Sequence, residues 1–370
     1  MARVKPDVES FARIKVIGIG GSGLNTLNHM INSKVRGVEF IAINTDAQHL
    51  HHNLAPKKIH IGKNLTRGMG TGMNQELGRQ AAEETKEEIQ DSIKGSDMVF
   101  IACGMGGGTG TGGAPIVAKI AKEQGILTIA VVTKPFSFEG SQRAKIAENG
   151  LLDLRESVDA MIVIPNDRIL GIVEKETTFS SAFMMCDEIL RQAVEGISDL
   201  ITMPGIINVD FADVKTIMQN AGSALMGIGS SQGEKRAEEA ARMAINSPLL
   251  DISIEGARGV LFAISGGQDM TMLEIQEAAN IITESIDEDA KVIFGAINDN
   301  RLKKNELKVT VIASGFPEIK NIKKQSLFSN VDAPKEKNTN VTINKDSSKQ
   351  KKEEEESEWD SIPAFLRRKK

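Results

Sequence analysis

Short apolar runs alternate along the first part of the chain with longer stretches in which apolar residues recur at helical spacing. Runs of this length indicate buried strands, which we expect at Ile14–Ile19, Phe40–Ile43, Met98–Ala102, Ile126–Val132 and Met161–Ile164. Such strands, separated by amphipathic helices, are typical of a parallel sheet covered on both faces. We therefore predict an α/β fold with a parallel, Rossmann-like sheet.

A long central helix is predicted from Phe179 to Ile201, and a second, smaller α/β domain follows it. Strands of this domain are expected at Ala224–Ile228, Val260–Ile264, Val292–Ile297 and Val309–Ala313, with helices over Lys235–Ile245 and Met272–Ile286. The domain has no glycine-rich loop and no cluster of catalytic residue types. We interpret it as a packing or assembly domain.

The last part of the chain has a different composition. Residues 318–356 are rich in Lys, Glu, Asn, Ser and Asp, which is typical of disorder. An apolar cluster with Ile362, Phe365 and Leu366 then follows, and it indicates a docking peptide on a flexible tether. The expected boundaries are a flexible N-terminus (1–12), a first α/β domain (13–178), the central helix (179–203), a loop with the following helix (204–221), the C-terminal α/β domain (222–316), a disordered linker (317–357) and a terminal peptide (358–370).

The candidate chemistry centres on a glycine-rich loop that follows the strand Met98–Ala102. Seven of the ten residues from Gly104 to Gly113 are glycine, and a helix is expected over Ala114–Gln124 with Pro115 in its first turn. Successive backbone N–H groups and the positive end of a helix dipole bind phosphate. The sequence therefore predicts a phosphate site here.

Because the lysine of a Walker loop is absent, the phosphate must be held in another way. We expect backbone N–H groups, the hydroxyls of Thr109 and Thr111, and a metal ion to hold it.

A second candidate loop lies near the start of the chain, where Gly18, Gly20 and Gly23 fit the dinucleotide-binding fingerprint. Asp46, after the next strand, lies about where such a fold binds ribose, so an NAD-dependent oxidoreductase is one alternative. Two glycine loops on separate strands instead favour a mononucleotide triphosphate that is held from both sides. Asp46 would then face a metal ion or a phosphate-bound water, although an ordinary turn residue fits equally well.

Further polar residues are expected beside these loops, because ligands of parallel sheets bind at the carboxyl ends of the strands. Thr133 and Asn166 follow two of the predicted strands, and Phe183 and Asp187 lie one turn apart on the long helix. A carboxylate can accept hydrogen bonds from the N1–H and amine of guanine, so Asp187 with Asn166 would select guanine and Phe183 could stack on it. A solvated Asp beside a core Phe is an equal alternative.

Glu139 and Arg143 could contact ribose and phosphate, or they could form a surface salt bridge. A third glycine-bearing loop, Thr66–Gly72, contains Arg67, which could reach a phosphate or remain solvated. His49, His51 and His52 match no zinc spacing, so exposed loop histidines are favoured over a metal site.

Asn208, Asp210 and Asp213 form a polar loop just past the long helix. They could position water and a cation near a terminal phosphate, and Asp210 or Asp213 could also cap a helix over Val214–Gln219. Because the glycine loops contain no acid, this loop offers the best candidate base for hydrolysis.

Composition narrows the class of protein. The net charge of −5 makes nucleic acid an unlikely main partner, and no apolar run is long enough to span a bilayer. The two cysteines, Cys103 and Cys186, form no metal or redox motif, which suits a reducing cytoplasm. We expect a cytoplasmic protein without direct membrane insertion.

These motifs, in this order, resemble the FtsZ family of bacterial tubulin-like division GTPases. The segment Gly106–Gly112 is similar to the tubulin-family signature, Gly20–Gly23 to the first glycine loop, Asn208–Asp213 to the synergy loop, and Asp360–Arg367 to the terminal peptide. The resemblance covers residues 13–316 and the last dozen residues. Ser22 replaces a common glycine, and Cys186 places a thiol beside the expected guanine acid.

The resemblance implies a role for each candidate residue. The residues expected around GTP or GDP, with Mg²⁺, are Gly20, Gly21, Ser22, Gly23, Asn25, Gly104, Gly107, Gly108, Thr109, Gly110, Thr133, Glu139, Arg143, Asn166, Phe183 and Asp187. Asp46 is expected beside the nucleotide from its position after the second strand. Asp210 and Asp213, with Asn208, would act on the nucleotide of the neighbouring subunit in a head-to-tail filament.

The resemblance also implies partners and a place in the cell. The terminal peptide would bind membrane-tethering adaptors such as FtsA through Asp360, Ile362, Pro363, Phe365, Leu366 and Arg367. The filaments would form the cytokinetic Z ring at mid-cell, under the membrane.

Overall fold

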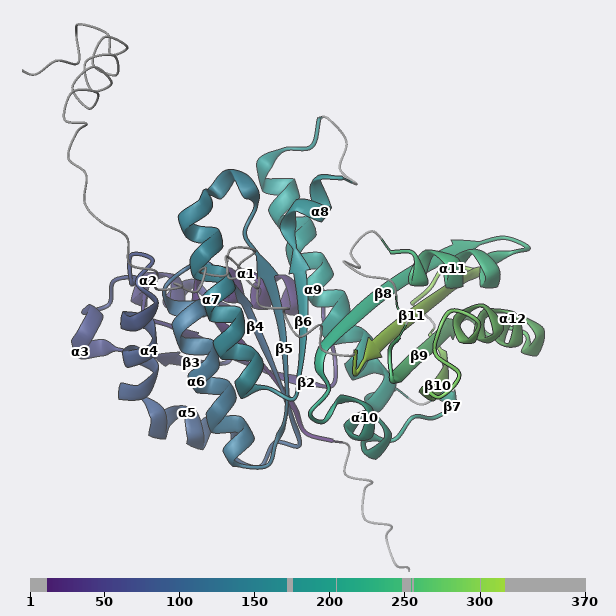
Figure 1. The fold of residues 1–370 in the computed structure, drawn as a ribbon, viewed down its shortest axis with the longest axis horizontal. Helices are drawn as coiled ribbons and strands as arrows, with labels where there is room; N and C mark the ends of the chain where they lie inside the picture. The colour runs from purple at the N-terminus through teal and green to yellow at the C-terminus, as the bar shows by residue number, and fades with distance from the viewer. Residues whose placement is uncertain are drawn as a thin grey trace, which may run out of the picture. The chain divides into compact units, whose positions relative to one another are not determined.

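The computed structural model describes residues 12–171, 176–203, 205–247, 254, 256–299 and 301–316, all within one compact unit (Figure 1). In this part of the chain, eleven strands form one sheet in the order β3-β2-β1-β4-β5-β6-β8-β11-β9-β10-β7. The strands are β1 (Ile14–Ile19), β2 (Val38–Asn44), β3 (Lys57–His60), β4 (Met98–Gly104), β5 (Leu127–Lys134), β6 (Ala160–Pro165), β7 (Gly205–Ile207), β8 (Gly222–Gln232), β9 (Gly259–Gly266), β10 (Lys291–Asn298) and β11 (Glu306–Ser314). The linker and terminal peptide expected beyond residue 316 lie outside the described residues.

Helices connect most of these strands. They are α1 (Gly20–Asn32), α2 (Ala47–His52), α3 (Lys63–Thr66), α4 (Gln75–Glu84), α5 (Lys86–Ile93), α6 (Thr109–Glu123), the 3₁₀ turn η1 (Ser137–Glu139), α7 (Ser141–Ser157), α8 (Asn166–Leu170), α9 (Phe179–Thr202), α10 (Phe211–Met218), α11 (Arg236–Ile245) and α12 (Met272–Thr283). In the described residues, no helix is long and apolar enough to cross a bilayer.

The first six strands of the sheet, β3-β2-β1-β4-β5-β6, are all parallel. The predicted α/β fold with a parallel sheet is therefore confirmed. This strand order is that of dinucleotide-binding folds, in which ligands bind where the order reverses. Here the order reverses between β1 and β4, the two strands that carry the glycine loops.

The rest of the sheet is mixed. β8 pairs with β6 in parallel, whereas β11 runs antiparallel to both of its neighbours, β8 and β9. Two edge strands, β3 and β7, were not among the strands predicted from the sequence. Both are short, at four and three residues, so neither gives the long apolar run that marks a buried strand.

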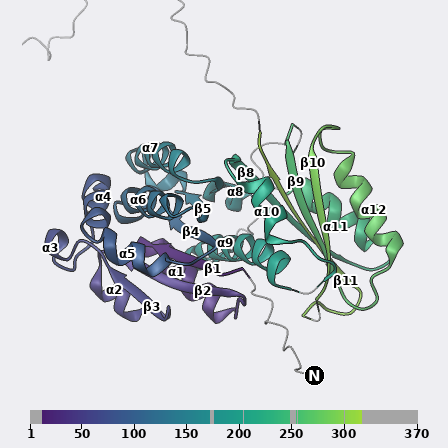
Figure 2. The ribbon, with the colours of Figure 1, turned by 90° about the horizontal axis from the view of Figure 1, so that it is seen from below.

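The apolar residues of each strand divide between two faces. In β1, Ile14 and Val16 join a core with α1 and α9, while Ile17 and Ile19 pack on the other face with α4, α5, α6 and α7 (Figure 2). The core around α9 also contains Leu261 of β9 and other side chains of the mixed part of the sheet. One continuous core thus joins both parts of the sheet to the long helix.

Three local predictions were wrong. Helix α6 begins at Thr109 rather than at Ala114, so Pro115 lies inside the helix and not in its first turn. The helix expected over Val214–Gln219 is α10, which begins at Phe211 rather than at Val214. The histidines near residue 50 lie on α2, whose N-terminus is capped by the Asp46 carboxylate, and not in a loop.

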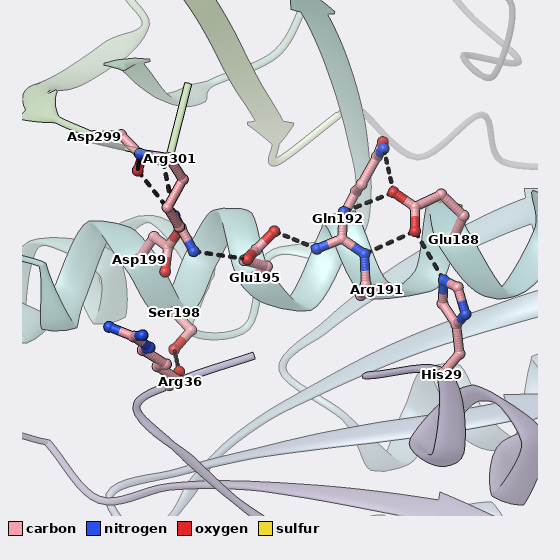
Figure 3. A network of polar contacts seen from close by, with 10 residues as sticks. All are labelled: His29, Arg36, Glu188, Arg191, Gln192, Glu195, Ser198, Asp199, Asp299 and Arg301. Carbon is pink, nitrogen blue, oxygen red and sulfur yellow. Dashed lines mark hydrogen bonds and ion pairs between the residues drawn. The ribbon is translucent and has the colours of Figure 1, made fainter. Parts of the chain in front are cut away.

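Charged side chains form a continuous row along α9 (Figure 3). Glu188 accepts hydrogen bonds from His29 of α1 and from Arg191, and Arg191 also pairs with Glu195. Arg301, from the segment between β10 and β11, donates to the second oxygen of Glu195 at 3.0 Å. The row therefore links α1, which starts at a glycine loop, to the mixed part of the sheet.

This row predicts a specific loss of stability in acid. Burial raises the pKa of Glu188, but hydrogen bonds from Arg191 and His29 outweigh it and hold that pKa at about 2, below the ordinary 4.5. A lowered folded-state pKa gives stability that is present above the unfolded-state pKa and is lost as the pH falls from about 4.5 toward 2. Because the side chain is 36% exposed, solvent screening reduces this contribution to about 1–2 kcal/mol.

We expect Glu188→Gln to lower the free energy of unfolding by about 1–2 kcal/mol at pH 7. As the pH falls, the free energy of unfolding should decrease less in this variant than in the unchanged chain. Chemical unfolding at a series of pH values measures both. Glu238→Gln, which removes an exposed ion pair with Arg242, is the control and should change little. If the free energy of unfolding depended on pH in the same way for Glu188→Gln and the unchanged chain, Glu188 would not be a source of the loss of stability in acid.

Candidate functional site

A cavity of about 200 Å³ lies at the carboxyl ends of β1 and β4, where the strand order reverses. Thirteen of the residues expected around the nucleotide line it: Gly20, Gly21, Ser22, Gly104, Gly107, Gly108, Thr109, Gly110, Thr133, Glu139, Arg143, Asn166 and Phe183. Ile19, Thr71, Met105 and Pro135 complete the lining. The two glycine loops, β5, β6 and the long helix thus meet at one site.

Two helix N-termini face this cavity. α1 begins at Gly20 and α6 at Thr109, so the two predicted loops are partly the first turns of helices. The first N–H groups of a helix have no partner within the helix, and the helix dipole is positive at that end. The site therefore presents backbone donors and positive potential from two directions, which suits a chain of phosphates.

The glycines of the first fingerprint have different roles. Gly20 has a φ of 72°, in the left-handed region that favours glycine. A side chain at Gly23 would overlap the carbonyl oxygen of Ala102 in β4, and one at Gly18 would meet Leu27. Gly23 therefore allows α1 to pack closely on the sheet and does not line the cavity, although the sequence placed it among the phosphate contacts.

Two polar atoms in the cavity wall lack protein partners. Among the described residues, the buried side-chain atoms without a hydrogen bond are Arg143 Nε, Asn166 Oδ1 and Asn298 Oδ1, and the first two belong to residues that line the cavity. Buried polar groups are almost always hydrogen-bonded. A bound ligand with both an acceptor and a donor would satisfy them.

Glu139 and Arg143 lie on the cavity wall and also form a salt bridge at 3.1 Å. The salt bridge expected as one alternative is therefore present, and both side chains also lie where a bound ligand could reach them. They do not share a helix, because Gly140, with a φ of 100°, separates η1 from α7.

On α9, Phe183 lines the cavity and contacts the rings of Phe136 and Phe179. Asp187, one turn further on, does not line the cavity, and its Oδ1 accepts a hydrogen bond from the Thr26 hydroxyl at 2.6 Å. Burial raises the pKa of Asp187, and the bond from Thr26 acts against that rise.

Asn25 and Asp46 lie beside the cavity rather than in its wall. The Asn25 side-chain oxygen pairs with the His49 ring at 3.1 Å. The Asp46 carboxylate accepts from the backbone N–H groups of Gln48 and His49 at the start of α2. Asp46 is thus a helix cap, which agrees with the plainer of the two interpretations of this residue.

Two threonines near the cavity have positions that were not predicted from the sequence. Thr71, from the third glycine loop, lines the cavity, whereas Arg67 of the same loop does not. Thr111 is fully buried, and its hydroxyl accepts from the Gly106 N–H at 2.9 Å, so it supports the loop from behind.

The candidate catalytic residues lie at the other end of α9. Asn208, Asp210 and Asp213 do not line the cavity, and both acids are exposed. Asp210 is the N-cap residue of α10, and its backbone N–H donates to the Asp213 carboxylate at 3.2 Å. Helical rise separates Phe183 from the end of α9 at Thr202 by about 28 Å, and Figure 1 shows α8 and α10 at opposite ends of this helix.

The buried surroundings of the Cys103 and Cys186 thiols make both groups unreactive. Burial raises the pKa of both Cys103 and Cys186 to about 12, so each is protonated at neutral pH. The thiol of Cys186, beside Asp187, therefore adds no nucleophile to the site.

Two protein families match consecutive parts of the chain. The Tubulin/FtsZ family, GTPase domain, matches residues 13–174, and the FtsZ family, C-terminal domain, matches residues 222–317.

Solved structures resemble the fold. An empty FtsZ dimer from M. jannaschii is 48% identical, with a TM-score of 0.79 over 83% of this chain and 89% of that one. A mutant of FtsZ from the same organism is also 48% identical, with a TM-score of 0.79 over 83% of this chain and 92% of the mutant's chain. A CetZ protein of Haloferax volcanii, solved as a protofilament with GTPγS bound, is 21% identical, with a TM-score of 0.71 over 83% and 94%.

The fold, the cavity between two glycine-bearing helix N-termini and these matches agree. The chain belongs to the FtsZ family of tubulin-like GTPases.

Proposed function

We propose that this GTPase polymerises head-to-tail into filaments and hydrolyses GTP at the interface between subunits. The observation that carries the proposal is the length of α9: about 28 Å of helix separate Phe183, which lines the cavity, from Thr202, beyond which Asp210 and Asp213 follow. One chain cannot bring these exposed acids to its own cavity without unfolding its longest helix. A second copy, stacked end to end, can place them at the mouth of the first.

In the proposed site, the N-termini of α1 and α6 bind the phosphates. Thr133, Glu139 and Arg143 surround the ribose and phosphates, while Asn166, Phe183 and Asp187 surround the guanine. The unpaired Asn166 Oδ1 and Arg143 Nε support this assignment, since guanine offers donors and phosphate offers acceptors. An ionised Asp187 would accept from guanine in addition to Thr26.

Mg²⁺ is proposed to arrive with the nucleotide. Among the described residues, no group of three or more His, Cys, Asp or Glu side chains is placed to hold a metal ion. Mg²⁺ is commonly held by phosphate oxygens and water with few protein ligands, and it would neutralise phosphate charge here. An NAD-dependent oxidoreductase, the alternative function considered from the sequence, would have the same strand order. Membership of the FtsZ family favours a GTPase instead.

At the cellular level, we propose that the filaments form the Z ring at mid-cell and recruit other division proteins. The solved FtsZ dimer of M. jannaschii supports self-association. We further propose that the terminal peptide binds FtsA or similar adaptors.

Turnover measured against protein concentration tests the shared active site. We expect GTP hydrolysis per subunit to be negligible in dilute solution and to rise together with light scattering, because each site then gains the acids of a neighbour. Hydrolysis per subunit that stays constant across the concentration range would mean that one chain holds a complete site.

A further inference from the structure

Three buried threonine hydroxyls form a chain behind the phosphate end of the cavity. Thr45 Oγ1 lies 2.8 Å from Thr109 Oγ1, and Thr109 Oγ1 lies 3.3 Å from Thr71 Oγ1. Thr109 and Thr71 line the cavity, whereas Thr45 does not. All three residues are more than nine-tenths buried, and Thr45 is fully buried.

Thr45 is held in place from two further directions. Its backbone N–H donates to the Asn44 side-chain oxygen at 2.9 Å. Its carbonyl oxygen pairs with His60 Nε2 at 2.9 Å, and because a carbonyl only accepts, that ring nitrogen carries the hydrogen. These bonds leave the Thr45 hydroxyl directed at Thr109.

Counting hydrogens gives the chain a direction. Within the described residues, the Thr45 hydroxyl has Thr109 as its hydrogen-bond partner. A buried O–H group that donates no hydrogen bond costs about 1–3 kcal/mol. Thr45 must therefore donate to Thr109. Thr109 and Thr71 then have two hydrogens for the one contact between them, so one hydrogen is left over on a residue that lines the cavity.

We propose that Thr45 is a positioning residue for the nucleotide, and that it acts through Thr109 to aim this remaining hydroxyl hydrogen at a phosphate oxygen. The proposal rests on the nucleotide site proposed above. With Thr45 as donor, one lone pair of Thr109 is engaged on the buried side, and this bond fixes the rotation of the Thr109 hydroxyl. Without it, the Thr109 hydroxyl is free to rotate and can turn a lone pair toward the anionic phosphate.

The test compares binding of GDP and of guanosine to dilute, unassembled chain. We expect Thr45→Val to weaken GDP binding about three- to tenfold, the cost of one hydrogen bond, and to leave guanosine binding unchanged. Thr45→Ser keeps the hydroxyl and should restore GDP affinity. Thr128→Val is the matched control, since Thr128 is equally buried in β5 and donates to the Ile126 carbonyl oxygen.

Two results would overturn the proposal. GDP affinity that is unchanged in Thr45→Val would show that the hydroxyl directs nothing, and equal losses for GDP and guanosine would show a merely structural role. Should the valine variant fold poorly, Thr45→Ala removes the same hydroxyl without added bulk, and the same comparison decides. Failure of the unchanged chain to bind GDP would instead refute the nucleotide site itself.

Discussion

Replacing Asp213 by alanine will leave GTP binding intact and reduce hydrolysis at least about a hundredfold, the usual contribution of a positioned acid or base. Binding should survive because Asp213 is exposed at the far end of α9 and does not line the cavity of its own chain. The folded structure should survive as well, since the carboxylate caps only the first turn of α10. The loss of that cap costs about 1 kcal/mol.

Nucleotide affinity of the dilute chain and hydrolysis by the assembled chain are the two measurements. Thr216→Ala, one turn along α10, removes another side chain that hydrogen-bonds locally and serves as the control. Loss of GTP binding in Asp213→Ala would make the loop a structural part of its own cavity. Unchanged turnover would remove Asp213 from the proposed chemistry.

The second large effect is expected where α6 packs on α4. A Cβ at Gly112 would overlap the Gln75 carbonyl oxygen and lie 2.6 Å from the Arg79 backbone nitrogen, so Gly112→Ala must push the two helices apart. We expect a loss of about 3 kcal/mol in the free energy of unfolding. We also expect weaker GTP binding, because the N-terminus of α6 lines the cavity and is the proposed phosphate site.

The neighbouring Gly113 provides the control. A Cβ there would lie 3.5 Å from Ile19 and 3.8 Å from Ala82, which is ordinary contact. Gly113→Ala should be neutral, or stabilising by up to about 1 kcal/mol from helix propensity. Chemical unfolding of the two variants measures the difference, and equal stabilities would mean that α4 shifts at little cost.

Much of the candidate site was predictable because many of the residues that line it lie close together in sequence. A strand followed by glycines and a helix specifies a phosphate site within about 20 residues, and both Gly20–Gly23 and Gly104–Gly113 contain that pattern. Parallel strands also bring their carboxyl ends to one edge of the sheet. Thr133 and Asn166 therefore line the cavity, as expected.

Other features depend on contacts that a single segment does not reveal. Asp46 follows a strand as a metal ligand would, yet its carboxylate caps α2. Thr45 and Thr71 meet at Thr109 only because β2, the third glycine loop and α6 converge. The early start of α6 was missed because glycine has low helix propensity, which tertiary packing overrides here.

The length of α9 has a consequence for the evolution of this chain. Each residue added to a helix rotates the next one by about 100° around the helix axis and advances it by about 1.5 Å. Deleting one residue between Asp187 and Asp199 would rotate α10 and its acids around that axis relative to Phe183 and the cavity. Insertions and deletions should therefore be tolerated in surface loops but excluded from this helix, because in the proposed filament its residue count would set both the repeat distance and the rotational phase of successive subunits.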